Sequence, residues 1–172
     1  MPKILENVRE QILEEAKKQV SEKGYGKTTV RSVASACGIG VGTVYNYFES
    51  KDMLIASFMI QDWNRFLCRM EGIDSEDSES LLAAVAEGIS GFMKEYGRLF
   101  SDPDAAKVYA EVFAVRHKQL REQLAGKIQP VCVKSNVEDT EFLAQWIAES
   151  MLTWTAAGKS FDEQYSIIKH LL

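Results

Sequence analysis

The sequence of 172 residues is poor in cysteine, histidine and proline, and each shortage excludes a class of protein. The three cysteines (Cys37, Cys68 and Cys132) are an odd number without a CxxC pair, so we expect reduced thiols in a cytosolic protein. The two histidines, His117 and His170, have no partner at metal-ligand spacing, so no metal or other cofactor is expected. Three prolines and eleven glycines are too few for a collagen-like or low-complexity chain.

Long hydrophobic runs are also missing. The longest run lies near residues 53–60 and is far shorter than the roughly 20 residues that a membrane span needs. Charged residues occur within the first few positions, which is not typical of a signal peptide. Because 46% of the residues are hydrophobic and 26% are charged, we expect a soluble cytoplasmic protein of one compact domain or two small ones.

Charge is divided unevenly along the chain, although the formal net charge is only −5. Residues 1–51 carry eight Lys/Arg and six Asp/Glu, whereas residues 52–172 carry twelve and nineteen. This modest excess of positive charge indicates that a polyanion would dock on the N-terminal part. The acidic run at residues 74–79 lacks the ligand spacing of a calcium loop, and we interpret it as a solvated loop.

Apolar residues recur at spacings of three and four along the chain, and no stretch alternates long enough to predict a strand, so the fold class is all-α. Thr28, Ser50 and Asp102 are predicted to cap helices, and Gly126 with Pro130 is predicted to end one. The secondary structure of residues 131–138 is ambiguous from the sequence. Helices are predicted at about 4–23, 29–37, 41–48, 51–70, 81–100, 103–126, 142–157 and 161–172.

Residues 28–54 have the layout of a helix-turn-helix, with two short helices that meet at residues 37–40. Ala34 is small enough for two helices to cross closely, and Ile39 supplies an apolar side chain between them. Gly38 can adopt the positive φ that a sharp turn requires. In such a motif the second helix lies in the major groove of DNA.

The second of these helices is predicted to bury one edge and expose the other. Val44 and Phe48 are four residues apart and face the core. The side chains left on the outer face and its flanks can donate to phosphates or contact base edges; they are Thr43, Tyr45, Asn46 and Tyr47.

This segment resembles the tetracycline-repressor (TetR) family of transcriptional regulators. The matching residues, 24–54, read GYGKTTVRSVASACGIGVGTVYNYFESKDML. The family pattern is a Gly, a capping Thr, an Ile/Val-Ala pair, a Gly-Val turn, a Gly-Thr-Leu/Val-Tyr-x-Tyr/His-Phe helix and a Lys-Glu/Asp-x-Leu continuation, and almost every element is present. The resemblance implies a three-helix DNA-binding domain at 1–50 and a helical effector-binding and dimerisation domain at 51–172.

The resemblance also implies a role for individual residues. Phosphate contacts would fall on Thr29, Arg31, Tyr45, Tyr47 and Lys51, and contacts with bases on Val41, Gly42, Thr43 and Asn46. Three positions depart from the family pattern. Gly40 stands where a capping Ser is common, and Val41 and Glu49 stand where Lys is common. Each lost phosphate contact should flatten the salt dependence by about one unit of slope. We therefore expect binding that is weaker, or that depends more on apolar contact between Val41 and thymine methyl groups.

The bulky side chains of residues 51–172 have two interpretations. Most of them simply fill a helical core, but a helical bundle so rich in aromatic residues can also enclose an apolar pocket, which the resemblance implies. We expect a small, mainly hydrophobic effector. The resemblance also implies a homodimer that forms through the last two helices. The predicted lining residues are Trp63, Phe66, Met93, Tyr109, Phe113 and Trp146.

The resulting hypothesis is a ligand-responsive transcriptional regulator, most often a repressor, that leaves a palindromic operator when its effector binds. The helix that starts at Lys51 joins the two predicted domains and would transmit the change. An enzyme is not expected, because the sequence has no Ser/His/Asp set, metal pair or phosphate-binding glycine loop. An interaction module whose helix-turn-helix no longer reads DNA stays open as an alternative, since position 41 lacks the usual Lys.

Overall fold

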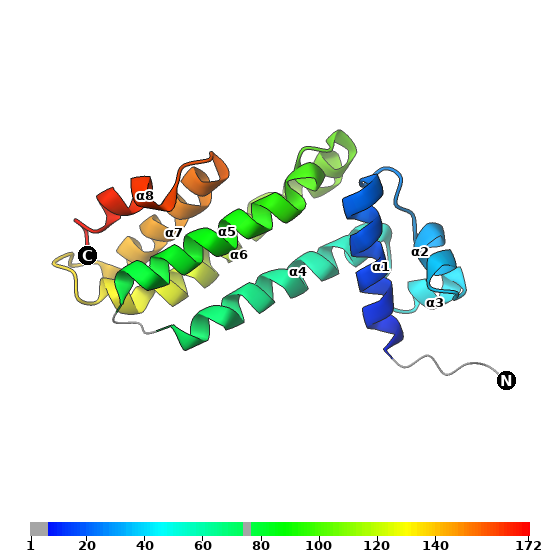
Figure 1. Ribbon diagram of the computed structural model, residues 1–172, viewed down its shortest axis with the longest axis horizontal. Coiled ribbons are helices and arrows are strands. Elements are labelled where there is room, and N and C mark those ends of the chain that lie inside the picture. Colours follow the sequence, from blue (N-terminus) through cyan, green and yellow to red (C-terminus); the bar gives the residue numbers. More distant parts are fainter. Residues whose placement is uncertain (1–6, 74–76) are drawn as a thin grey trace. The chain divides into compact units, whose positions relative to one another are not determined.

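The computed structural model describes residues 7–73 and 77–172, and of residues 108–116 it describes the backbone alone. Within these residues every regular element is a helix, which confirms the all-α prediction (Figure 1). None of the described helices is both long and apolar enough to span a bilayer. The elements are α1 (Val8–Lys23), α2 (Val30–Ala36), α3 (Val41–Tyr45), α4 (Lys51–Arg69), the 3-10 turn η1 (Met70–Gly72), α5 (Ser78–Phe100), α6 (Pro103–Cys132), α7 (Thr140–Ala156) and α8 (Phe161–Ile168).

The first of two compact units comprises Met1–Asn64 and Tyr96–Tyr109. Helices α1, α2 and α3 pack on one another in it, and their inner faces are closed to solvent. Val44 is fully buried and Phe48 is 4% exposed, so the predicted inner edge of the second short helix is confirmed. The fully or almost fully buried side chains around them are Ile12, Leu13, Ala16, Val33, Ala34, Leu54, Ile55 and Phe58.

The second unit comprises Arg65–Glu95 and Ala110–Leu172. Its core is aliphatic, with Leu82 and Val85 of α5, Leu124 and Ile128 of α6, and Ile147 of α7 all fully buried. Helices α4, α5 and α6 each contribute residues to both units. The two units are defined by the packing of residues, whereas the predicted boundary at residue 50 separates a DNA-binding domain from an effector-binding domain. That boundary stays a prediction.

Most helix ends agree with the sequence. Gly24 (φ 82°), Gly38 (φ 67°) and Gly158 (φ 84°) have the left-handed backbone that favours glycine. Ser50 accepts the Met53 amide, and Asp102 accepts the amides of residues 104 and 105, so both predicted caps are confirmed.

One predicted cap is wrong. Thr29 caps α2 by accepting the Ser32 amide at 3.0 Å, and the Ser32 hydroxyl accepts the Thr29 amide in return. Thr28 is buried instead, and its hydroxyl donates to the Gly24 carbonyl at 2.9 Å. Both threonines have the chemistry of a cap, and the turn after α1 decides which of them occupies the site.

Three helix lengths also differ from the prediction. Helix α8 ends at Ile168 and not at residue 172. Helix α3 ends at Tyr45, a turn of residues 46 and 47 follows, and Phe48 lies after that turn. Helix α6 runs through Gly126 and Pro130 to Cys132. Pro130 removes one backbone donor. Burial of Ile128, Val131 and Cys132 around it offsets that loss, so the helix continues.

Gly88 of α5 is required by its close approach to an aromatic ring in the second unit. A Cβ at residue 88 would lie 1.8 Å from Cε2 of Phe66, which is 7% exposed. We therefore expect Gly88→Ala to lower the free energy of unfolding by about 1–3 kcal/mol, as overpacking does. Gly91→Ala on the same helix is the control, because its Cβ would meet nothing within 4 Å and alanine is the better helix former. Chemical denaturation measures both, and equal stability of the two variants would contradict the packing at Gly88.

Candidate DNA-binding site

The start of α2 is fixed to α1 by a buried polar side chain. Gln19 is 2% exposed, and its amide nitrogen donates to the Ser32 carbonyl at 3.2 Å while its amide oxygen accepts the Ser32 hydroxyl at 2.6 Å. The same Ser32 takes part in the capping pair with Thr29. The sequence analysis missed Gln19, although a polar residue three positions after Ala16 on the apolar face of α1 is a usable signal. Thr29 and the exposed Arg31 are thereby held on a fixed helix start.

The turn from α2 to α3 is closed by backbone hydrogen bonds. The Ile39 amide donates to the Ala34 carbonyl at 3.0 Å, and the Thr43 amide donates to the Gly40 carbonyl at 2.9 Å. Gly40 is the N-cap of α3 and provides no side-chain hydrogen bond. Because Val44 anchors α3 to the core, the short helix has a fixed orientation although it has only five residues.

The predicted DNA contacts on α3 and the turn after it face solvent to different degrees. Tyr45 is 52% exposed and Tyr47 is 48% exposed, and Gly42 and Asn46 are also exposed. Val41 and Thr43 are half-buried. Large aromatic side chains with this much exposure beside fully buried Val44 do not serve the core, so their hydroxyl groups are accessible to a ligand.

Lys51, the remaining predicted phosphate contact, is held by a residue that the sequence analysis did not select. Its ammonium donates to the main-chain carbonyl of Tyr25 at 3.1 Å and lies 3.5 Å from the centroid of the Tyr25 ring. The Tyr25 hydroxyl donates to Oδ1 of Asp52 at 2.6 Å. Burial, followed by the hydrogen bond and charge of Asp52, raises the pKa of Tyr25, so the phenol stays protonated and donates.

The predicted effector residues are divided between the two units. Trp63 and Phe66 are buried on α4, and Met93 is half-buried on α5. The side chains of Tyr109 and Phe113 lie outside the described residues. Trp146 is 42% exposed on α7. As a lining of one pocket, the set stays a prediction.

Trp146 lines a groove between α7 and α8 in the second unit. The groove has a volume of about 360 Å³, and its walls combine apolar side chains with a polar rim. Phe142, Trp146 and Trp154 lie on one side of α7 at multiples of four residues, with Ser150 between the two tryptophans. On α8, Ile167 is 63% exposed. We call this surface the α7–α8 face and define it by Phe142, Trp146, Trp154 and Ile167.

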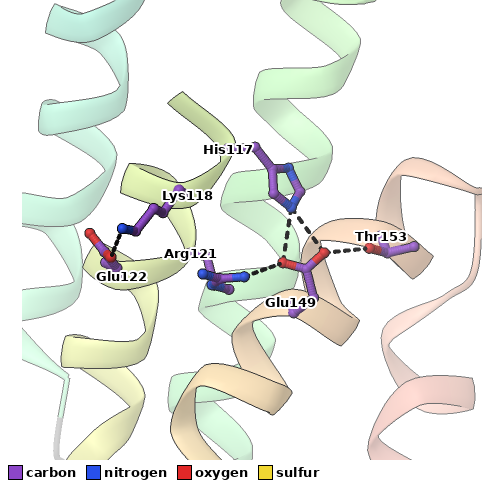
Figure 2. Close-up of polar contacts among 6 residues, drawn as sticks. All are labelled: His117, Lys118, Arg121, Glu122, Glu149 and Thr153. Carbon is purple, nitrogen blue, oxygen red and sulfur yellow. Dashed lines mark hydrogen bonds and ion pairs between the residues drawn. The ribbon is translucent and has the colours of Figure 1, made fainter. Parts of the chain in front are cut away.

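Figure 2 shows a polar cluster that joins α6 to α7 in the second unit. His117 Nε2 lies 2.9 Å from both carboxylate oxygens of Glu149, Arg121 lies 3.6 Å from one of them, and Thr153 donates to the other at 3.3 Å. Burial alone would raise the pKa of Glu149, but the His117 hydrogen bond, the charges of His117 and Arg121 and the Thr153 bond outweigh it. The pKa of Glu149 therefore lies below its ordinary value.

This lowered pKa predicts how stability changes with pH. A carboxylate whose pKa falls on folding contributes stability above its unfolded pKa and loses it as the pH falls through the folded value. We expect Glu149→Gln to lower the free energy of unfolding by about 0.5 kcal/mol near pH 6, because the side chain is 40% exposed and water screens the pair. The difference should shrink as the pH falls below the ordinary glutamate pKa of 4.5, and it should vanish only below the lowered folded pKa. Glu122→Gln, whose carboxylate is 3.7 Å from Lys118, is the control; a difference that persists in acid would contradict the cluster.

Comparison with known proteins finds relatives of the segment that carries the helix-turn-helix. Residues 12–58 match the model of bacterial regulatory proteins of the tetR family. HTH-type transcriptional regulator UidR of Escherichia coli is 36% identical over 73 residues, covering 40% of this chain and 37% of UidR. HTH-type transcriptional repressor Rv1474c of Mycobacterium tuberculosis is 30% identical over 118 residues, covering 64% of this chain and 63% of the repressor. The chain thus matches less than two thirds of the length of either relative.

A solved structure extends the likeness to the fold of nearly the whole chain. The Thermus thermophilus TetR-family transcriptional repressor FadR, in complex with lauroyl-CoA, superposes with a TM-score of 0.58 at 21% identity, covering 95% of this chain and 92% of FadR. The family consists of DNA-binding regulators and not of enzymes, in agreement with the prediction from the sequence. The helix-turn-helix segment thus matches the tetR family of bacterial regulatory proteins, and nearly the whole chain shares the all-helical fold of a solved TetR-family repressor.

Proposed function

We propose that this protein is a ligand-responsive regulator of transcription that binds a palindromic DNA operator and is released by a small, mainly hydrophobic effector. The observation that carries the proposal is that α3 and the turn after it have a buried side, with Val44, and an exposed side, on which Tyr45 and Tyr47 are close to half exposed. Such a helix can enter the major groove without disturbing the core beneath it. Repression is the outcome we propose, as in the name of the Mycobacterium tuberculosis relative.

The proposed contacts divide into those that position the protein and those that read sequence. Thr29, Arg31, Tyr45, Tyr47 and Lys51 bind phosphates, which fixes the register of α3 on the duplex. Reading of the bases falls on Val41, Gly42, Thr43 and Asn46. Because Val41 cannot donate a hydrogen bond, it favours thymine, whose methyl group is exposed in the major groove.

A homodimer through the α7–α8 face would provide the two reading helices that a palindrome requires. This face exposes two tryptophans, a phenylalanine and an isoleucine, each at least 42% accessible. A cluster of this kind is typical of an interface core, in which aromatic residues are enriched. A two-fold dimer would present its recognition helices to half-sites about one helical turn apart, roughly 34–36 Å, or somewhat more.

The effector is proposed to act through α4, which contributes Lys51–Asn64 to the first unit and Arg65–Arg69 to the second. A ligand that binds better to a conformation unsuited to the operator lowers DNA affinity by the ratio of its two affinities. Lauroyl-CoA is a sensible first probe, because the Thermus thermophilus repressor binds it and its chain is apolar.

Selection of duplexes from a random pool, followed by fluorescence anisotropy, tests the proposal. We expect a palindromic consensus, an affinity at least 10³-fold above that for a scrambled duplex, and a steep salt dependence. Equal and weak binding to every duplex would instead support an interaction module. Addition of lauroyl-CoA and other apolar ligands then tests release, and operator affinity unchanged by a ligand that saturates the protein would contradict the α4 mechanism.

A further inference from the structure

Tyr25 makes three contacts with the first two residues of α4 and is itself 6% exposed. Its carbonyl accepts the Lys51 ammonium, its ring lies under the same ammonium, and its hydroxyl donates to Asp52. The turn that carries Tyr25 is also closed, because the Thr28 amide donates to the Tyr25 carbonyl at 3.2 Å and the Thr28 hydroxyl donates to Gly24. Tyr25 therefore connects a rigid turn to the start of α4.

The turn that carries Tyr25 lies directly before α2 in the sequence. It ends at Thr29, the N-cap of α2, and thus leads directly into one set of proposed phosphate contacts. Lys51 stands at the first position of α4 and provides the other set. The recognition helix α3 lies between these two positions in the sequence. A side chain that fixes the turn to Lys51 therefore also fixes the distance between the proposed phosphate contacts at the start of α2 and the one at Lys51.

We propose that Tyr25 is a positioning residue for DNA binding, which holds the Lys51 ammonium at the distance from the start of α2 that two phosphates of one duplex require. The inference rests on the proposed function and goes beyond it, because it gives a role to a buried residue outside the proposed DNA contacts.

The Lys51 ammonium has enough donors to bind Tyr25 and a phosphate at the same time. A lysine ammonium has three N–H donors, of which the Tyr25 carbonyl takes one, while the contact with the ring face uses none in particular. The other two can bind phosphate oxygens without displacing Tyr25. Since the lysine is ordered before DNA arrives, it loses less conformational freedom on binding, which raises affinity in the same way as other preorganised contacts.

The same geometry gives Asp52 a role. Its carboxylate would repel a phosphate, but the Tyr25 hydroxyl occupies one of its oxygens at 2.6 Å. Asp52 is the residue after Lys51, and this hydrogen bond holds its carboxylate toward Tyr25. Tyr25→Phe removes this bond and keeps the ring and carbonyl, so the variant separates the effect of Asp52 from that of Lys51.

A double-mutant cycle measured by anisotropy on the selected operator duplex tests the proposal. We expect Lys51→Met to lower affinity about 10-fold and to reduce the salt slope by about one unit. Tyr25→Leu removes the ring and hydroxyl, and should lower affinity about 5- to 10-fold in the wild-type background but less than 2-fold in the Lys51→Met background. Tyr25→Phe should stay within about 3-fold of the wild type. Thermal unfolding of each variant is the control that tests whether it is folded.

Two results would overturn the proposal. Losses of affinity that multiply in the double variant would mean that Tyr25 acts independently of Lys51.

A measurement on the unmodified protein covers the case in which Tyr25→Leu does not fold. The protons beside the Lys51 ammonium should show an upfield NMR shift from the Tyr25 ring, both in the free protein and in its complex with the duplex. Loss of this shift on binding would mean that Lys51 leaves Tyr25 to reach DNA. If the wild type binds no duplex specifically, the proposed function fails as well, whereas specific binding with independent losses removes the role of Tyr25 alone.

Discussion

Removal of two hydroxyl groups, by Tyr45→Phe together with Tyr47→Phe, should lower affinity for the selected operator by at least about 100-fold. Both side chains are close to half exposed, and each hydroxyl is proposed to donate to a phosphate. A hydrogen bond to a charged group contributes about 1.5–3 kcal/mol, so the loss of two corresponds to about 3 kcal/mol or more. The melting temperature should not change, because neither hydroxyl belongs to the core. Anisotropy titrations and thermal unfolding measure the two quantities.

The salt dependence distinguishes this effect from a loss of charge. The double phenylalanine variant keeps every cation, so its salt slope should equal that of the wild type, whereas Lys51→Met should flatten the slope. Tyr165→Phe on α8 is the matched control, since it removes a tyrosine hydroxyl outside the proposed site. Wild-type affinity in the double variant would exclude Tyr45 and Tyr47 from the interface.

Charges placed on the α7–α8 face should produce the second large effect. We expect Trp154→Glu with Ile167→Glu to convert the proposed dimer to a monomer, because like charges would meet across a two-fold interface. Operator affinity should then fall at least 100-fold, since the second half-site no longer benefits from a linked reader. The helical content should stay, as the two side chains are 52% and 63% exposed. Sedimentation equilibrium and anisotropy measure association and binding.

Val133→Glu provides the control for this experiment. Val133 is 64% exposed and apolar, but it lies outside the residues that define the face. We expect the control to retain both the dimer and operator affinity. If the wild type is a monomer at micromolar concentration, or if the paired glutamates leave the dimer intact, the assignment of the face is wrong.

The helix-turn-helix was predictable because its signals are local. The spacing of Val44 and Phe48 indicated the buried edge, and Gly38 indicated the turn; both agree with the structure. The two tyrosines that the same pattern left outside are exposed. Local rules failed where two residues of equal chemistry compete, as Thr28 and Thr29 do for one cap. They also failed at Pro130, where burial of the neighbouring side chains outweighs the missing donor.

Contacts between distant segments were not predictable in this way. Gln19 and Ser32, and likewise Tyr25 and Lys51, lie 13 and 26 residues apart and are joined only when the helices pack. The aromatic pattern of residues 51–172 could not separate core from surface either. Trp63 and Trp146 both follow helical spacing, yet Trp63 is 4% exposed and Trp146 is 42% exposed. Periodicity identifies a face of a helix, but not the partner of that face.

Hydrogen exchange on the protein with and without DNA tests the central claim, that the exposed edge of α3 enters the groove of a duplex. The experiment compares the selected operator with a scrambled duplex of equal length and charge. We predict that the operator slows exchange at residues 40–48 and at the start of α2, and that the scrambled duplex protects these amides far less. Specific binding of the operator without any change at residues 40–48 would contradict the account.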